Sequence, residues 1–455
     1  MRAPLMQTVH RATWRVPQLE PGTIFRQFHD QTTVLQRLNL AFLSTFLFIM
    51  FSRVFDVKFS TLHIPGITFR FLALFLILTG AFVAAFRDSI GKCVLGFTSF
   101  LILAIPFSVW RGGSVQVLMN WLIGLVVFMA TAALIPDFRR YVRTARTMAF
   151  AILVLTVICT TLGSMENGRL TLESGRFANP NEMAQALLLG MPFMWAIYST
   201  SRPLVSKALV VGALCLMLYV ISKTGSREAL ISIAVIGTFM FLRTSALGKM
   251  KLVMTAGIVL LIAVLILPEG LKARYRTFFS TEVEDNASDE PVDRAMLDMA
   301  VASANSRKEM LKRSLILTAK HPLLGVGPGM FAVAENEMAR AEGKRRGAWL
   351  GTHNSFTEVS SECGIPAFLF YSAVVGLSFK KSYRLYRRTR HSPEFSEIST
   401  HALALNYSLM AFIVTGMFVH AAYTALLPVL AGMTVSLVRT AEPEIAGRQP
   451  DYERA

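Results

Sequence analysis

The chain is divided into blocks of apolar residues that are long enough to cross a lipid bilayer. A helix needs about 20 apolar residues to span about 30 Å of hydrocarbon, and fewer where its ends snorkel. Only 16% of the residues are charged and 53% are hydrophobic, whereas a soluble protein has about 25% charged residues. This argues against a soluble enzyme, a disordered polymer and a disulfide-stapled secreted domain, and it predicts an all-α polytopic membrane protein of about 12 transmembrane helices. The predicted spans are residues 38–55, 69–86, 93–110, 114–135, 147–163, 183–199, 203–222, 227–242, 250–268, 355–379, 401–419 and 421–438.

The basic residues lie mainly in the short loops on one side of these spans. The chain carries 46 Lys and Arg against 29 Asp and Glu, a formal charge of +17, which in a soluble protein would indicate a nucleic-acid partner. With both termini in the cytoplasm, the inner segments hold 25 basic residues and the short outer loops hold 8. This asymmetry follows the positive-inside rule, so we expect both termini to be cytoplasmic and no nucleic acid to be bound.

A long outer segment, residues 269–352, separates the ninth predicted span from the tenth. Pro291 can open a helix within it, and a second helical stretch runs from Met330 to about Ala341. A segment of this length with helical patterning is more typical of a functional loop than of a simple connector. The expected organisation is a polar leader with a candidate amphipathic interface helix at 1–37, spans 1 to 9 at 38–268, a helical periplasmic loop at 269–352, spans 10 to 12 at 353–438 and a cytoplasmic tail at 439–455.

Three arginines flank the outer ends of the predicted spans. Arg227 opens span 8, Arg274 follows span 9, and Arg307 lies in the long outer loop. A cation at a helix N-terminus meets the positive end of the helix dipole, and a bound anion would reverse that penalty. Arginines on one face can also form a fork-like clamp for a diphosphate. Taken alone, however, Arg227 is explained more simply by snorkelling to the headgroups. Three further basic residues of the outer loop are interpreted as solvated or headgroup-facing charges: Arg276, Lys308 and Arg313.

His353 directly precedes span 10 in the sequence Gly-Thr-His-Asn-Ser-Phe. The dipole of the following helix disfavours imidazolium, so the ring is biased towards the neutral form, which can accept a proton from an attacking hydroxyl. The structural alternative is an interface or capping histidine, with Asn354 or Ser355 as the helix cap. Glu358 and Glu362, early in span 10, are candidate partners for the outer arginines.

A glycine-rich turn, from Gly325 through Gly327 to Gly329, lies in the long outer loop. Without the lysine and the strand of a P-loop, this spacing is weak evidence for phosphate binding, and a tight backbone fold over the membrane face is the simpler interpretation. The Asn179-Pro-Asn181 sequence before span 6 is typical of a turn with a helix cap. No HExxH motif, histidine pair or acidic cluster indicates a metal, so we expect neither a metal nor another cofactor.

Four motifs follow one another along the chain: Phe177-Ala-Asn-Pro-Asn181; Thr224-Gly-Ser-Arg227; His321-Pro-Leu-Leu-Gly-Val-Gly-Pro-Gly329; and His353-Asn-Ser-Phe-Thr-Glu358 with Glu362-Cys-Gly-Ile-Pro366. Together with the span count and the large outer loop, they resemble the superfamily of O-antigen ligases and Wzy-type O-antigen polymerases, which are bacterial envelope glycosyltransferases. The resemblance covers roughly residues 177–380. It implies a GT-C-type fold in the bacterial inner membrane and a metal-independent enzyme, active at the periplasmic face, whose donor is an undecaprenyl-diphosphate-linked glycan.

The resemblance also implies roles for individual residues. The essential histidine of the family corresponds to His353 and one essential arginine to Arg227. The second essential arginine corresponds to Arg307, judged by its spacing to the glycine-rich turn, with Arg274, which matches a further common arginine after span 9, as the alternative. We therefore expect the arginines to stabilise the diphosphate leaving group and His353 to deprotonate the acceptor. The expected substrate-binding residues are Arg274, Asn354, Gly325, Gly327 and Asn181.

The acceptor is left open by the resemblance. In a ligase it is lipid A–core, in a polymerase it is another lipid-linked repeat unit of O-antigen or exopolysaccharide, and in a protein O-oligosaccharyltransferase it is a hydroxyl side chain. A 12-span transporter is the alternative from another class, because transporters place ionisable residues in broken helices near the middle of the membrane. Here the informative polar residues gather at the outer face, which favours an enzyme.

Overall fold

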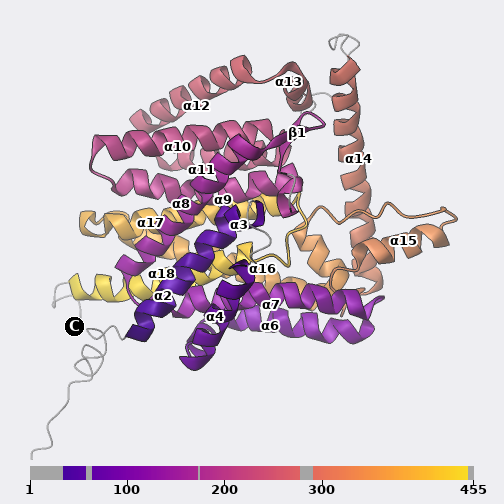
Figure 1. Ribbon diagram of the computed structural model, residues 1–455, viewed down its shortest axis with the longest axis horizontal. Coiled ribbons are helices and arrows are strands. Elements are labelled where there is room, and N and C mark those ends of the chain that lie inside the picture. Colours follow the sequence, from indigo (N-terminus) through magenta and orange to yellow (C-terminus); the bar gives the residue numbers. More distant parts are fainter. Residues whose placement is uncertain (1–33, 58–63, 173–174, 277–290, 449–455) are drawn as a thin grey trace, which may run out of the picture.

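The computed structural model describes residues 34–57, 64–172, 175–276 and 291–448. Most of these residues are helical, and the longer helices lie side by side in a bundle (Figure 1). The one sheet among the described residues is a small antiparallel hairpin of β1 and β2. The elements are α2 (Val34–Ser52), α3 (Val54–Val57), α4 (Ile64–Leu78), α5 (Phe82–Ala85), α6 (Ser89–Ala104), η2 (Ile105–Phe107), α7 (Arg111–Ala133), α8 (Phe138–Leu162), β1 (Ser164–Glu166), β2 (Arg169–Thr171), η3 (Gly175–Ala178), α9 (Pro180–Thr200), α10 (Leu204–Lys223), α11 (Arg227–Arg243), α12 (Ala246–Ile266), α13 (Glu269–Arg276), α14 (Pro291–Lys320), α15 (Phe331–Ala341), α16 (Ser355–Thr389), η4 (Pro393–Phe395), α17 (Ser396–Gly416) and α18 (Leu426–Arg448).

Seven helical stretches in the described part of the chain are long and apolar enough to cross a membrane. The protein is therefore an all-α, multi-pass membrane protein, as the apolar blocks predict. Each of the 12 predicted segments overlaps at least one helix, and their number as membrane spans stays a prediction. The candidate amphipathic helix of the leader, from Ile24 to Leu38, lies outside the described residues up to residue 33, and its last part from Val34 belongs to α2. The seven stretches are Ser89–Phe107, Arg111–Ala133, Phe138–Leu162, Leu204–Lys223, Ala246–Ala263, Ser355–Thr389 and Pro393–Gly416.

Two predicted spans have different bounds in the structure. The segment at 69–86 is divided between α4 and α5, with Gly80 at φ +61° between them, a conformation that favours glycine. The segment at 421–438 begins late, because residues 417–425 form turns and α18 starts at Leu426. Ser355 stabilises these turns: its hydroxyl donates to the carbonyl of Val419 at 2.7 Å and accepts from the N–H of Ala421 at 3.0 Å.

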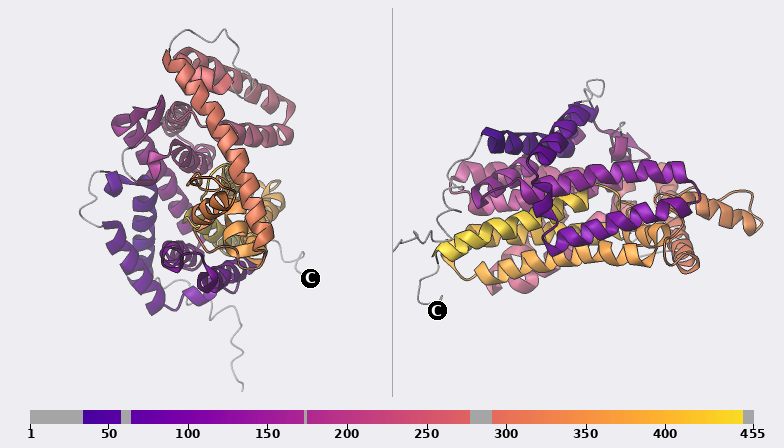
Figure 2. Two further views of the ribbon diagram at one scale, coloured as in Figure 1. Left: turned by 90° about the vertical axis from the view of Figure 1, so that its right-hand side faces the viewer. Right: turned by 90° about the horizontal axis from the view of Figure 1, so that it is seen from below.

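The helix α16 lies at the centre of the bundle, packed against α6, α17 and α18. The core is built from large apolar side chains such as Phe97, which meets Trp121 edge to face at 4.8 Å. The indole N–H of Trp121 finds a partner in the Thr98 hydroxyl at 2.9 Å, as a buried indole requires. The helix α14 runs across one end of the bundle and α15 projects beyond it (Figure 2).

A kink in α16 fixes how the chain before α15 docks on the bundle. Gly364 has φ +83°, and Pro366 follows within the helix. Because proline has no N–H, the carbonyl of Glu362 loses its helical partner. That carbonyl accepts instead from the N–H of Gly327 at 2.8 Å, and the N–H of Val326 donates to the carbonyl of Ser361 at 3.0 Å. The glycine-rich turn is therefore the element that fills the kink.

Candidate active site

A cavity of about 290 Å³ lies where α11, α14 and the start of α16 meet. It brings together four residues that the sequence analysis singled out from distant parts of the chain: Arg227, Arg307, His353 and Asn354. The cavity therefore combines cationic side chains with an imidazole in one space. Its full lining is Arg227, Glu228, Ile231, Ala304, Arg307, Lys308, Leu311, Thr352, His353, Asn354, Met417 and Phe418.

The first turn of α11 contributes Arg227 and Glu228 to the wall of this cavity. The turn follows Gly225, whose φ of +60° favours glycine. The N-cap residue Ser226 makes no side-chain capping hydrogen bond. The positive end of the helix dipole therefore adds to the charge of Arg227 beside the cavity, and both favour a bound anion.

Arg307 reaches the cavity from α14 and pairs with Glu228. One guanidinium nitrogen of Arg307, Nη1, lies 3.6 Å from Oε2 of Glu228. The Glu228 side chain is 2% exposed and that of Arg307 is 18% exposed. The other carboxylate oxygen, Oε1, is buried and makes no hydrogen bond within the described part of the chain. The sequence motifs do not single out Glu228, and the local signal for it is its place directly after Arg227 at the start of a helix.

Arg274 and Asn181 lie behind the cavity rather than on its wall. Arg274 is 6% exposed and donates from Nε to the carbonyl of Gly225 at 2.9 Å. Arg169 donates to the carbonyl of Thr224 at 2.7 Å and to the side-chain oxygen of Asn181. Burial, and then the neighbouring Arg274, lowers the pKa of Arg169 to about 9. These contacts hold the turn before Arg227 in place. Arg274 binds this turn directly, and Asn181 binds it through Arg169.

His353 lies on the cavity wall in a strained backbone conformation. Its φ is +51°, in the left-handed region that non-glycine residues rarely adopt. Its ring is 5.5 Å from that of His420, at an interplanar angle of 75°. Burial lowers the pKa of His353 to about 4, and the charges of His420 and Arg307 contribute. At neutral pH the imidazole is therefore uncharged and able to accept a proton.

Asn354 is the N-cap of α16. Its side-chain oxygen accepts hydrogen bonds from the backbone N–H groups of Phe356 at 2.9 Å and Thr357 at 3.1 Å. The capping alternative that the sequence left open is thus realised by Asn354, while the adjacent His353 faces the cavity. The cap also fixes the point at which the chain enters α16, and so the place of His353.

Gly325, Gly327 and Glu362 belong to the kink of α16 and do not line the cavity. A Cβ atom at Gly325 would come within 2.2 Å of the backbone of Glu362, and one at Gly327 within 2.1 Å of the Ser108 hydroxyl. The Glu362 carboxylate, expected to face an arginine, instead accepts from the N–H of Gly329 at 2.7 Å and from the Tyr423 hydroxyl at 2.7 Å. The backbone interpretation of the turn, which the sequence also allowed, fits these contacts.

A larger cavity of about 670 Å³ adjoins the first, and Thr352 lines both. Its wall is mostly apolar and comes from α2, α4, α7, α15, α16 and the turns before α18. Polar groups reach it from His420, whose ring contacts that of His353, from Asn120 and Arg53, and from the carboxylates Glu358 and Glu362. The chain segment that carries His353 therefore separates two cavities of different character.

No cluster of three or more His, Cys, Asp or Glu side chains suited to a metal ion occurs among the described residues. The cysteines in this part of the chain, Cys93, Cys159, Cys215 and Cys363, form no disulfide.

Comparison with known proteins gives a family match for the segment that supplies most of the lining of this cavity. Residues 212–372 match the family model described as O-antigen ligase, a segment from α10 into α16 that includes Arg227, Arg307 and His353. A search among curated proteins found no match. The family match supports a glycosyltransferase of the O-antigen ligase or polymerase type, acting on lipid-linked glycans at a membrane. Residues 212–372 are therefore similar to the O-antigen ligase family, which confirms the resemblance of this chain to the superfamily of O-antigen ligases and Wzy-type polymerases.

Proposed function

We propose that the protein is a GT-C-type glycosyltransferase of about 12 spans that moves a glycan from undecaprenyl diphosphate to lipid A–core. The observation that carries this proposal is the cavity shared by Arg227, Arg307 and His353. In the reaction, the bond between the sugar C1 and the diphosphate oxygen breaks, and a bond forms between C1 and the acceptor oxygen. The acceptor proton passes to the imidazole, and undecaprenyl diphosphate leaves with the electron pair of the broken bond.

The arginines would stabilise the charge that grows on the leaving diphosphate. Arg227 and Arg307 reach the cavity from two different helices, α11 and α14. A fork of guanidinium donors suits two linked phosphate groups. A preorganised donor of this kind is worth about 3–4 kcal/mol in the transition state. No metal is needed in this scheme, because the protein itself supplies the positive charge.

His353 would act as the general base towards the acceptor hydroxyl. Its neutral imidazole lies on the wall of the cavity that also contains the two arginines. Deprotonation in the transition state typically contributes about 10²–10⁴ in rate. The larger cavity beyond Thr352 is the proposed place of the acceptor, because the two cavities meet at the segment that carries the base.

We place this end of the bundle at the periplasmic face of the inner membrane. The helix α16 begins beside the cavity, and its last turn contains Arg387 and Arg388. Its 35 residues are long enough to cross a bilayer. Basic residues gather on the cytoplasmic side of membrane proteins. In this orientation both termini are cytoplasmic and residues 269–352 form a periplasmic loop over the substrates.

A panel of acceptors tests which reaction the protein catalyses. Purified protein in nanodiscs would receive an undecaprenyl-diphosphate glycan with lipid A–core, without any added acceptor, or with a hydroxyl-bearing acceptor protein. A single acceptor-dependent shift of lipid A–core supports the ligase. A ladder of glycan lengths without lipid A–core would replace it by a polymerase, and modification of the protein alone by an O-oligosaccharyltransferase. Absence of transfer in all three would contradict the proposal and favour a transporter.

A further inference from the structure

The chain segment that delivers His353 to the cavity has no regular secondary structure of its own. It leaves α15 after Ala341 and reaches α16 at Ser355. Trp349 and His353 within it both have left-handed φ angles, of +54° and +51°. Such conformations persist only where the surroundings hold them. The segment must therefore be fixed by contacts with its neighbours.

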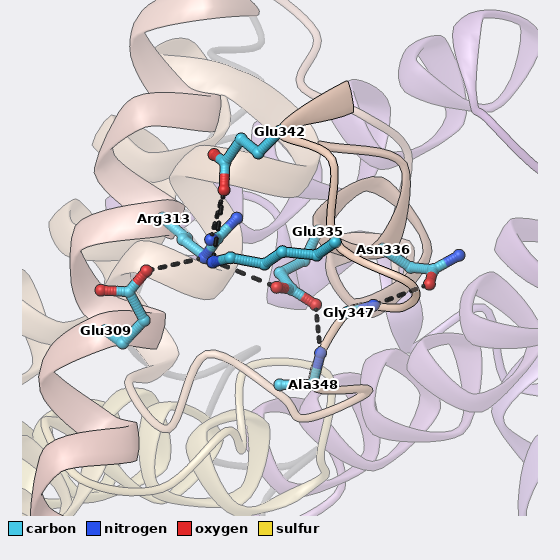
Figure 3. Close-up of polar contacts among 8 residues, drawn as sticks. Glu309, Arg313, Glu335, Asn336, Glu342, Gly347 and Ala348 are labelled. Carbon is cyan, nitrogen blue, oxygen red and sulfur yellow. Dashed lines mark hydrogen bonds and ion pairs between the residues drawn. The ribbon is translucent and has the colours of Figure 1, made fainter. Parts of the chain in front are cut away.

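Arg313 of α14 is a buried arginine at the centre of a charge cluster beside this segment (Figure 3). Its side chain is 5% exposed and meets three carboxylates. Nε lies 2.9 Å from Glu309 and 3.5 Å from Glu335, and Nη2 lies 2.8 Å from Glu342. Glu309 and Glu342 are about half exposed, whereas Glu335 is 2% exposed. The sequence interpretation of Arg313 as a solvated charge is therefore wrong. The spacing of residues along α14 could not show that α15 places Glu335 against this arginine.

Glu335 connects this cluster to the backbone of the segment. One carboxylate oxygen faces Arg313, and the other accepts from the N–H of Ala348 at 2.8 Å. The adjacent Asn336 accepts from the N–H of Gly347 at 2.9 Å (Figure 3). A Cβ atom at Gly347 would lie 2.2 Å from the Glu335 carboxylate, so this approach requires glycine. Two consecutive backbone N–H groups are thus tied to α15, and through Glu335 to α14.

We propose that Arg313 and Glu335 are positioning residues that set the place of His353 relative to Arg307. This inference rests on the proposed glycosyl transfer. Arg307 and Arg313 lie on the same helix, about 9 Å apart along its axis. Arg307 faces the cavity, while Arg313 acts through Glu335 on the segment that ends at His353. One rigid helix therefore fixes both the charge for the leaving group and the base for the acceptor.

The alternative is that the cluster only joins α14 to α15. The two roles differ in what a weakened cluster would change. A joint between helices affects the stability of the whole loop and leaves the chemistry of the folded enzyme unaltered. A positioning contact affects turnover and the surroundings of the His353 ring, which faces His420, Arg307, Arg227 and Glu228.

Three variants of the full-length protein in nanodiscs separate these roles. Glu335→Gln removes the charge that holds Arg313 and weakens the contact with Ala348. Asn336→Ala removes the contact with Gly347 and leaves all charges in place, so it serves where Glu335→Gln folds poorly. Glu309→Gln is the matched control, because Glu309 contacts the same guanidinium but not the segment. Amide hydrogen exchange of a peptide covering 344–352 measures how firmly Glu335 and Asn336 hold the segment. Steady-state glycan transfer measures how that hold affects turnover.

We expect Glu335→Gln and Asn336→Ala to speed amide exchange in this peptide and to lower kcat by about 10- to 10²-fold, since small displacements of a reacting group have effects of this size. The donor KM should change less than twofold, and the acid limb of the pH–rate profile should move upward as the ring gains solvent. Glu309→Gln should change none of these. Faster exchange with unchanged kcat and pH profile would show that the cluster only connects α14 to α15. Unchanged exchange would show that Glu335 and Asn336 do not hold the segment in place. A wild-type protein without transfer would refute the proposed function. The exchange data would still decide whether Glu335 and Asn336 hold the segment in place.

Discussion

Arg307 and Glu228 form an ion pair on the wall of the cavity that Arg227 and His353 also line, with 3.6 Å between Nη1 and Oε2. Among the described residues that line this cavity, Glu228 is the one acidic side chain. It faces Arg307 while Arg227 lies next to it in the chain. A diphosphate that entered this cavity would therefore compete with Glu228 for Arg307.

Glu228→Gln should strengthen the binding of undecaprenyl diphosphate. The change removes a negative charge that repels the diphosphate. At an effective dielectric constant of about 20, and after a discount for solvent screening, the binding free energy should improve by about 1 kcal/mol. This corresponds to about a fivefold lower Kd for the product. Titration calorimetry in nanodiscs measures it, with the exposed Glu337→Gln as the control. Weaker binding by Glu228→Gln would show that Glu228 orients Arg307 instead of competing with the ligand.

Lysine should not replace Arg307 or Arg227 if the two guanidinium groups act as forks. Lysine keeps the charge and loses the bidentate geometry. We expect either substitution to lower kcat by about 10²-fold, as the loss of one preorganised donor does. Arg346→Lys, at an exposed arginine of the outer loop, should leave single-turnover transfer unchanged. Full activity of both cavity variants would leave only a requirement for charge.

The pH dependence of transfer should report the lowered pKa of His353. A general base must be unprotonated, so a pKa lowered to about 4 by burial, by His420 and by Arg307 keeps it active into acid. We expect kcat/KM to stay level from neutral pH to about pH 5 and to fall as the pH passes through about 4. His420→Gln removes one cause and should move this limb towards the ordinary value of about 6.5. A wild-type limb already near 6.5 would contradict the assignment.

Gly364→Ala should destabilise the fold at the kink of α16. With φ at +83° and a Cβ only 2.2 Å from the Leu323 carbonyl oxygen, alanine is both strained and in steric conflict with backbone. A loss of about 2–4 kcal/mol is expected from such a site. Gly376→Ala, in the same helix with open space around it, should cost nothing. Thermal unfolding followed by tryptophan fluorescence compares the two, and equal midpoints would contradict the role of the kink.

The apolar blocks and the charge asymmetry were sufficient to predict an all-α membrane protein, because bilayer thickness and backbone hydrogen bonding leave few alternatives. They could not locate the break at Gly80 or the late start of α18. Those boundaries depend on tertiary contacts, such as the Ser355 hydroxyl that binds Val419 and Ala421. Helix patterning likewise anticipated α15, which runs from Phe331 to Ala341.

The motifs selected Arg227, Arg307, His353 and Asn354, but the sequence could not show that these residues line one cavity, and their roles stay predictions. What the sequence could not provide was the set of partners that tertiary structure brings together. Glu228 meets Arg307 from another helix, and the buried cluster around Arg313 joins α14 to α15. Contacts between segments far apart in the chain leave no periodic pattern in the sequence. Neither of these two sets of ion pairs could therefore be predicted from the positions of the charged residues.

Glycan transfer by His353→Asn tests the central claim most directly. Asparagine tolerates the left-handed φ of this position, so the variant removes the base without straining the backbone. With undecaprenyl-diphosphate glycan and lipid A–core, we predict a single-turnover rate about 10²–10⁴ below wild type, with unchanged donor binding. His321→Asn, at an exposed histidine before α15, should retain full activity. A His353→Asn variant that transfers glycan at the wild-type rate would contradict the account.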